Sequence, residues 1–139
     1  TFLFIFFFFL TQTGGNSGNQ SITLMIRGLS TGEIRFRDIW KIMGKELLVG
    51  ILLGIGTGIV IMLRSYFFPP GIEIFQAVTI GISLIFVVLF SSFIGALAPL
   101  IINRLGFDPT VMSGPLMATV IDVVGLTLYF EIAKMLLHL

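Results

Sequence analysis

The chain has 139 residues, of which 56% are hydrophobic and only 11% are charged, and its mean hydropathy is +1.09. A soluble domain carries about 25% charged residues, so this composition argues against a water-soluble enzyme, a collagen and a disordered chain, and it indicates a membrane protein. The net charge of +1 gives no basis for a nucleic-acid partner, and the lack of cysteine excludes disulfides, thiolate metal sites and cysteine nucleophiles.

The first predicted helix covers about residues 2–29, and a polar stretch interrupts it between Thr11 and Ser21. The apolar run at residues 1–10 has no basic residues before it and no small-x-small cleavage site after it, so we expect half of a membrane helix here and not a signal peptide. On a helix of 3.6 residues per turn, several polar residues share or border one face. These residues are Thr13, Asn16, Asn19, Gln20, Thr23 and Arg27.

This polar face must turn towards protein or water, because an unpaired amide in lipid costs several kcal/mol. A flexible loop is the alternative, but it would leave residues 1–10 too short to span a membrane. On a helix, the face is either a seam of interhelical hydrogen bonds or the lining of a hydrated pathway. The three carboxamides of Asn16, Asn19 and Gln20 favour the pathway. Gly14 and Gly18 lie four residues apart on a neighbouring face and predict close helix packing.

Three further helices are predicted at about residues 44–63, 74–102 and 110–137, each long enough to cross a hydrocarbon core. The prolines at 69–70 and the segment 103–109 separate them, and Pro109 is well placed to begin a helix. These segments are continuous apolar runs, whereas barrel strands would alternate every second residue. The predicted fold class is therefore all-α, a polytopic transmembrane bundle of four helices.

Basic residues predict the orientation of this bundle, because short cytoplasmic loops are enriched in lysine and arginine. The connection between the first two helices contains five of them, whereas the next connection contains only Arg64. We therefore expect the loop at residues 30–43 to be cytoplasmic and the C-terminus to lie outside, in a cell (inner or plasma) membrane. The five residues are Arg27, Arg35, Arg37, Lys41 and Lys45.

Asp122 is the only ionisable residue deep inside a predicted span. An unpaired carboxylate at that depth costs at least about 2.5–3.5 kcal/mol. Three interpretations follow: Asp122 is a protonated acid that is hydrogen-bonded within the bundle, it pairs with a helix outside this sequence, or it forms a cation site or a proton relay. Ala118 precedes it by one turn, Gly114 by two, and Thr119 and Gly125 flank it, so backbone carbonyls lie within reach of its carboxylate. Carboxylate, carbonyl, carboxamide and water oxygens favour Mg²⁺, Ca²⁺ or Mn²⁺.

The remaining candidates lie on the second predicted helix. Gly50, Gly54 and Gly58 form a ridge of small residues and predict a packing surface. Glu46, near the cytoplasmic end, is either an acid at an ion entrance or an interfacial charge. The sequence contains no nucleophile–base set, phosphate loop or zinc spacing, so we expect no enzymatic activity.

Two passages resemble a known family. Residues 13–21, followed by a basic turn, are similar to the second membrane helix of the MgtE magnesium channels. A second passage is similar to that family's last loop and fifth helix. It runs from Pro99 and Leu100 through residues 104–109 to Gly114-Pro115 and residues 118–125. The order and spacing agree, so the whole chain corresponds to helices two to five of the family.

The resemblance implies a homodimer in the lipid bilayer with a cation pore on the two-fold axis, lined by helices two and five. It implies that Asp122 is the selectivity acid, that Ala118 contributes a backbone carbonyl, and that Asn16 and Asn19 line the pathway for Mg²⁺, the transported ion and ligand. We expect further lining from Gly15, Gln20, Thr23, Gly114 and Thr119. Residues 1–139 would then be the transmembrane cation-channel domain, without the first membrane helix and the cytosolic sensor domains that regulate full-length relatives.

The leading functional hypothesis is thus a magnesium channel pore domain that conducts partly hydrated Mg²⁺ into the cytoplasm. A proton- or Na⁺-coupled secondary transporter of divalent cations is the alternative, with Asp122 as the coupling site. A non-conducting membrane assembly subunit is the third possibility, in which the polar helix and the glycine ridge serve only packing.

Overall fold

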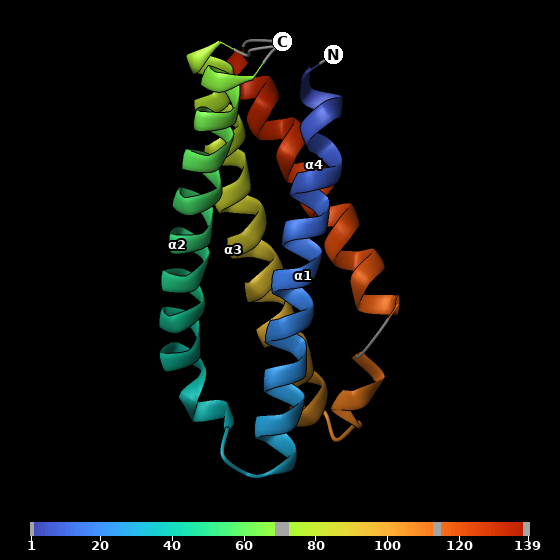
Figure 1. Cartoon of the computed structure of the whole chain (residues 1–139). Helices are drawn as coiled ribbons and strands as arrows, with labels where there is room; N and C mark the ends of the chain where they lie inside the picture. The colour runs from blue at the N-terminus through green and yellow to red at the C-terminus, as the bar shows by residue number, and fades with distance from the viewer. Residues whose placement is uncertain (1, 69–72, 113–114, 138–139) are drawn as a thin grey trace.

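The computed structural model describes residues 2–68, 73–112 and 115–137, and all regular structure in these ranges is helical. This confirms the predicted all-α fold with four long helices (Figure 1). In chain order, the elements are α1 (Phe2–Ser30), the 3₁₀ helix η1 (Phe36–Asp38), α2 (Ile39–Phe67), α3 (Ile74–Arg104), the 3₁₀ helix η2 (Pro109–Met112) and α4 (Pro115–Leu137).

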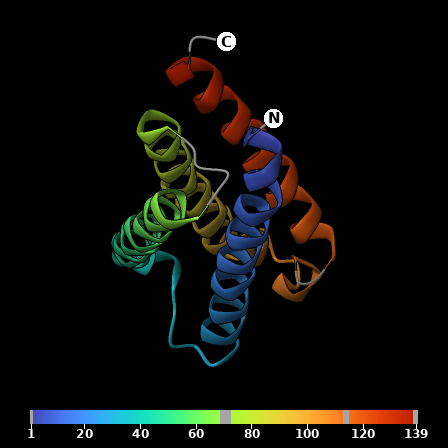
Figure 2. The same ribbon diagram turned by 45° about the horizontal axis from the view of Figure 1, so that its top comes forward.

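Helix α3 is the centre of the bundle, because α1, α2 and α4 all pack against it. The first residues of α1 and the last residues of α4 lie at one end of the bundle, and the turn between α1 and α2 lies at the other (Figures 1 and 2). The side chains that α3 buries are mostly small or β-branched, such as Ser83, Val87, Ser92 and Ala96. Small residues let neighbouring backbones approach closely, which is how helices associate where lipid tails remove the hydrophobic driving force.

Three of the helical segments in the described chain are long and apolar enough to cross a membrane: Phe36–Arg64, Ile74–Arg104 and Leu116–Leu136. Helix α1 is not among them, although its 29 residues extend for about 44 Å. The sequence predicted four segments of sufficient length, and α1 differs from the others because its middle is polar. In that middle, Gly14 and Ser17 pack against α3 and Gly18 packs against α4, so other helices cover one side of the polar stretch.

Two helix boundaries differ from the predicted ones. Helix α2 begins at Ile39 and not near residue 44, because η1 leads directly into it and the Asp38 carboxylate accepts the backbone N–H of Arg35 at 2.9 Å. Pro109 begins η2, and α4 starts only at Pro115. The turn before η2 contains Gly106 at a φ of 82°, a left-handed conformation that glycine adopts without strain.

The outward side of α2 carries large apolar side chains, as expected for a surface that faces lipid. Leu48, Leu52 and Val60 are each about 60% exposed in the isolated chain. The opposite side holds the glycine ridge against α3, where Gly50 faces Leu89, Gly54 faces Ile85 and Gly58 faces Gly81. The bundle therefore has a lipid-like exterior over α2 and a close interface with α3.

Candidate functional site

The polar stretch of α1 is helical, and its side chains divide between two opposite sides of the helix. Asn16, Asn19, Gln20 and Thr23 are exposed and, with Leu24, line a shallow groove on the surface of the chain. The Thr23 hydroxyl donates to the backbone oxygen of Asn19 at 2.9 Å. The three carboxamides have no hydrogen-bond partner among the residues that the structure describes, so they do not form a seam within a single chain.

The seam is formed by smaller residues on the other side of α1. Ser17 and Ser92 share a buried hydrogen bond of 2.7 Å between their hydroxyls, which joins α1 to α3. A Cβ atom added at Gly14 would lie 2.6 Å from Cγ1 of Val87, and Gly18 lies against Ile121 of α4. Glycines and serines thus hold α1 inside the bundle and leave the carboxamides facing outwards.

Asp122 is exposed on α4 at the place where this helix meets α1. A Cβ atom at Gly15 would be 3.2 Å from Oδ1 of Asp122, so the glycine leaves room for the carboxylate beside the α1 backbone. No hydrogen bond or ion pair to this carboxylate is found within the described ranges. Asp122 lines a small open depression that also includes Phe7, Thr11, Val123 and Leu126.

The surroundings of Asp122 include the other predicted residues of α4. Ala118 is half-buried one turn before Asp122, and Thr119 is exposed next to it. Gly114 lies outside the described residues. The structure thus places the acid beside Gly15 of α1, whereas the carboxamides of Asn16 and Asn19 are exposed on the same helix and line a separate groove.

Glu46 lies apart from this group. Its Oε2 atom accepts a hydrogen bond of 2.7 Å from the Ser21 hydroxyl, on the buried side of α1. It lines a cavity of about 390 Å³ at the end of the bundle that contains the α1–α2 turn. The other charged residues around this cavity are Glu33, Asp38, Lys41 and Lys45.

The oxygen donors beside Asp122 suit a hard cation, but one chain does not provide a complete ligand set. In the described part of the chain, no three acidic or histidine side chains come close enough together to hold a metal ion. A cation beside Asp122 would therefore be held through water, backbone oxygens or a second chain.

Comparison with known proteins gives the family of the chain. The family model named MgtE, described as a divalent cation transporter, matches residues 8–132. The chain belongs to the MgtE family. The resemblance noted from the sequence is thereby confirmed, and the three helices able to cross a membrane agree with a membrane-embedded transporter family.

Individual MgtE relatives match over most of this chain. The magnesium transporter MgtE of Thermus thermophilus is 41% identical over 129 residues, which cover 93% of this chain and 28% of the relative. The magnesium transporter MgtE of Enterococcus faecalis is 29% identical over 136 residues, 98% of this chain and 30% of the relative. That of Bacillus subtilis is 30% identical over 124 residues, 89% of this chain and 27% of the relative. The chain thus spans less than a third of the length of these MgtE proteins.

Two features of this MgtE segment were not predicted from the sequence. Gln12 is exposed one turn before Asn16 and extends the polar side of α1, and its spacing of four residues from Asn16 could have indicated this. The hydrogen bond between Ser21 and Glu46 had no comparable signal, because it depends on how the turn at residues 31–38 folds back.

Proposed function

We propose that this chain is the pore domain of a magnesium channel, which functions as a homodimer and conducts partly hydrated Mg²⁺ into the cytoplasm. Membership of the MgtE family and the name "magnesium transporter" carried by its relatives support Mg²⁺ as the transported ion. The direction follows from the electrochemical gradient of a divalent cation, which the negative interior of a cell favours.

One observation carries the proposal. Asp122 is exposed beside Gly15 of α1, and the carboxamides of Asn16, Asn19 and Gln20 are exposed on that same helix, in a chain whose other helices are apolar enough for lipid. Exposure of these groups to hydrocarbon would cost several kcal/mol each. A second copy on a two-fold axis would cover these groups and enclose a hydrated path between the two α1 and two α4 helices.

The chemistry of Mg²⁺ suits such a path. Mg²⁺ gives up its waters reluctantly and prefers octahedral oxygen coordination. Two Asp122 carboxylates across the axis would hold the hydrated ion, whose charge offsets their mutual repulsion, and the Ala118 carbonyls would accept hydrogen bonds from its waters. Because few direct ligands hold the ion, it also leaves readily, as conduction requires.

The same proposal assigns an orientation. The end of the bundle with the α1–α2 turn contains Arg27, Arg35, Arg37, Lys41 and Lys45, and this excess of basic residues supports a cytoplasmic position for residues 30–43 and an outside C-terminus. Glu46 then lies at the cytoplasmic end of α2, where its carboxylate would attract cations near the inner mouth.

A coupled transporter is the second candidate, and the exposed carboxylate of Asp122 favours it as well. An acid with no partner among the residues that the structure describes can bind a proton or Na⁺ in alternation with the transported ion. Uptake would then depend on the pH or Na⁺ gradient, whereas uptake through a channel follows the Mg²⁺ gradient and the membrane potential alone.

The test is Mg²⁺ uptake into liposomes for the wild type, Asp122→Asn and the matched loop variant Asp108→Asn. We expect Asp122→Asn to lose most of the uptake and the stabilisation by Mg²⁺ in detergent while it stays dimeric, and we expect Asp108→Asn to behave as the wild type. Equal uptake by Asp122→Asn and wild type would overturn the ion site. Loss of the dimer in Asp122→Asn would instead support the assembly subunit, and uptake that requires a proton or Na⁺ gradient would support the coupled transporter.

A further inference from the structure

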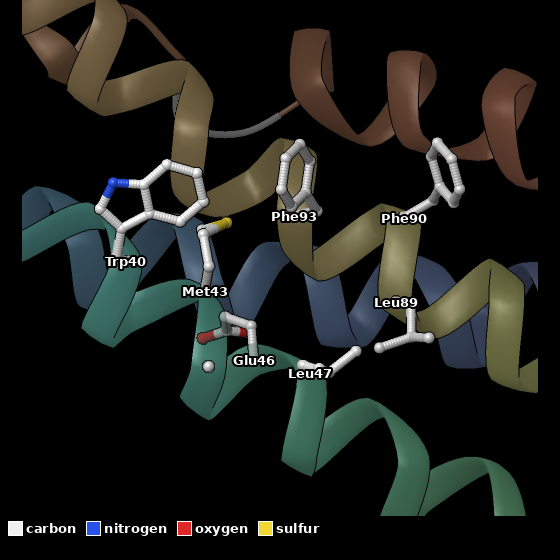
Figure 3. Close-up of a pocket in the computed structure, with 8 residues that line it drawn as sticks. Trp40, Met43, Glu46, Leu47, Leu89, Phe90 and Phe93 are labelled. Carbon is white, nitrogen blue, oxygen red and sulfur yellow. The ribbon is translucent and has the colours of Figure 1, made fainter.

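An apolar groove runs between α2 and α3, away from the contact of α1 and α4 at Asp122. Its volume is about 520 Å³. Figure 3 shows the rings of Trp40, Phe93 and Phe90 standing on the same side of the two helices. The residues that line the groove are Trp40, Met43, Gly44, Glu46, Leu47, Leu89, Phe90 and Phe93.

The walls of this groove are large aromatic side chains that the chain leaves uncovered. Trp40 is 82% exposed, and Phe90 and Phe93 are each about 45% exposed. Between them lies Gly44, where an added Cβ atom would meet nothing within 4 Å. Trp40 is the second residue of α2, and tryptophan is enriched where membrane helices meet the headgroup region. The groove thus runs from the membrane interface towards the hydrocarbon.

A positive charge, that of Arg104, lies outside the groove lining, beyond the end of the groove that Trp40 marks. Phe90, Phe93 and Arg104 are spaced by 3 and 11 residues, which places Arg104 on the face of α3 that carries the two rings. The Arg104 guanidinium lies over the ring of Phe36, with Cζ 4.2 Å from the ring centroid. Phe36 is the first residue of the 3₁₀ helix η1, which leads directly into α2. No carboxylate pairs with Arg104 within the described ranges, so its donors are available to a phosphate.

The one acid in the lining does not oppose a negative ligand directly. The Glu46 carboxylate accepts the Ser21 hydroxyl at 2.7 Å, which holds it towards α1. The apolar groove and the Arg104 guanidinium beyond its Trp40 end together complement a lipid that has an acyl chain and an anionic headgroup.

We propose that this groove binds one anionic phospholipid, with an acyl chain along Trp40, Phe90 and Phe93 and the headgroup phosphate on Arg104. A zwitterionic lipid offers the same chain and phosphate, but its choline or ethanolamine cation lies close to the guanidinium. The structure therefore predicts selectivity for phosphatidylglycerol over phosphatidylcholine. This inference is independent of the ion pathway.

Trp40 is the only tryptophan of the chain, so its fluorescence reports directly on the groove. The chain is reconstituted in vesicles of phosphatidylcholine with a fixed minor fraction of phosphatidylglycerol, and the acyl chains of one lipid or the other are brominated. Bromine quenches tryptophan on contact. We expect quenching per mole of lipid to show about a fivefold preference for phosphatidylglycerol, which corresponds to about 1 kcal/mol for one cation at the membrane surface.

Two pairs of variants test the cation and the apolar groove separately. Arg104→Gln should abolish the preference, whereas Arg27→Gln, which removes a charge at the same end of the bundle, should keep it. Gly44→Leu should lower quenching by both lipids because it fills the groove. Gly56→Leu is its control, since an added Cβ at Gly56 also meets nothing within 4 Å. Circular dichroism and melting temperature verify that each variant folds.

Equal quenching by the two brominated lipids in the wild type would mean non-selective contact with bulk lipid and would overturn the proposal. Weak quenching of Trp40 by both lipids in the wild type would mean that a protein segment fills the groove, and this result would also overturn the proposal. Native mass spectrometry gives a second measurement. One phosphatidylglycerol retained by the wild type and Gly56→Leu, but lost by Arg104→Gln and Gly44→Leu, would support the proposal, and retention by all four would contradict it.

Discussion

The Ser21 hydroxyl on α1 and the Glu46 carboxylate on α2 form a hydrogen bond of 2.7 Å across the helix interface. Glu46 lines both the apolar groove between α2 and α3 and the polar cavity beside the α1–α2 turn, so it lies at the boundary between them. Ser21 belongs to the buried side of the helix whose other side carries Asn19 and Gln20. This contact therefore connects the start of α2 to the polar helix.

Ser21→Ala should destabilise the bundle, because it leaves a half-buried carboxylate without its donor. Hydrogen bonds to charged groups contribute about 1.5–3 kcal/mol, and we expect a loss in that range in the free energy of unfolding in detergent. Glu46→Gln should cost less, since the amide oxygen can still accept the Ser21 hydroxyl. A double-mutant cycle with Ser21→Ala and Glu46→Ala should give a coupling energy above about 0.5 kcal/mol. Additive effects of the two alanine substitutions would contradict the contact.

Gly95→Ala should also destabilise the chain, because the α1 backbone lies close to α3 there. A Cβ atom at Gly95 would lie 2.5 Å from the backbone oxygen of Gly18, and backbone cannot move aside as a side chain can. Overpacking of this kind costs about 1–3 kcal/mol, which thermal unfolding in detergent would measure. Gly56→Ala is the control, since it meets no atom and should leave stability unchanged or raise it. Equal melting temperatures for the two variants would argue against the close approach.

Much of this architecture could be predicted because it depends on local sequence. The apolar runs indicate four helices, and the 3.6-residue spacing of Asn16, Gln20 and Thr23 correctly places them on one exposed side of α1. The glycine spacing at Gly50 and Gly54 likewise indicates the face of α2 that meets α3.

Other features depend on contacts that no local pattern encodes. The position of Asp122 beside Gly15 results from how α4 packs on α1, and the two residues are more than a hundred positions apart. Helix α2 starts at Ile39 because it continues from the 3₁₀ turn held by Asp38. The charged residues in this segment interrupt the apolar pattern, so the sequence predicted a later start. Arg104 meets Phe36 only because α2 and α3 are antiparallel neighbours, so the cation beyond the Trp40 end of the groove could not be predicted.

Asp108 should make a small contribution to stability that depends on pH. Hydrogen bonds from the backbone N–H and the side chain of Thr110 lower the pKa of this carboxyl below its ordinary value of 3.8, and the N–H lies 2.9 Å from Oδ1. A lowered folded-state pKa stabilises the protein above the unfolded-state pKa, and this stabilisation is lost as the pH falls through the folded-state pKa. The difference in melting temperature between wild type and Asp108→Ala should therefore be constant from neutral pH down to about 4 and shrink below it. A difference that grows on acidification would contradict the sign.

Gly15→Ala should separate ion conduction from stability. The added Cβ would lie 3.2 Å from Oδ1 of Asp122, a distance at which the carboxylate must shift by a few tenths of an ångström. If Asp122 holds hydrated Mg²⁺ on the two-fold axis, such a shift alters the separation of the two carboxylates and lowers the Mg²⁺ flux. In a preorganised site, a misplacement of about 1 Å can lower the rate a hundredfold. We expect Mg²⁺ uptake into liposomes to fall severalfold, while the melting temperature without Mg²⁺ stays near that of Gly44→Ala, whose Cβ meets no atom. Unchanged uptake in Gly15→Ala, with Asp122→Asn inactive, would mean that the charge of Asp122 matters and its position beside α1 does not.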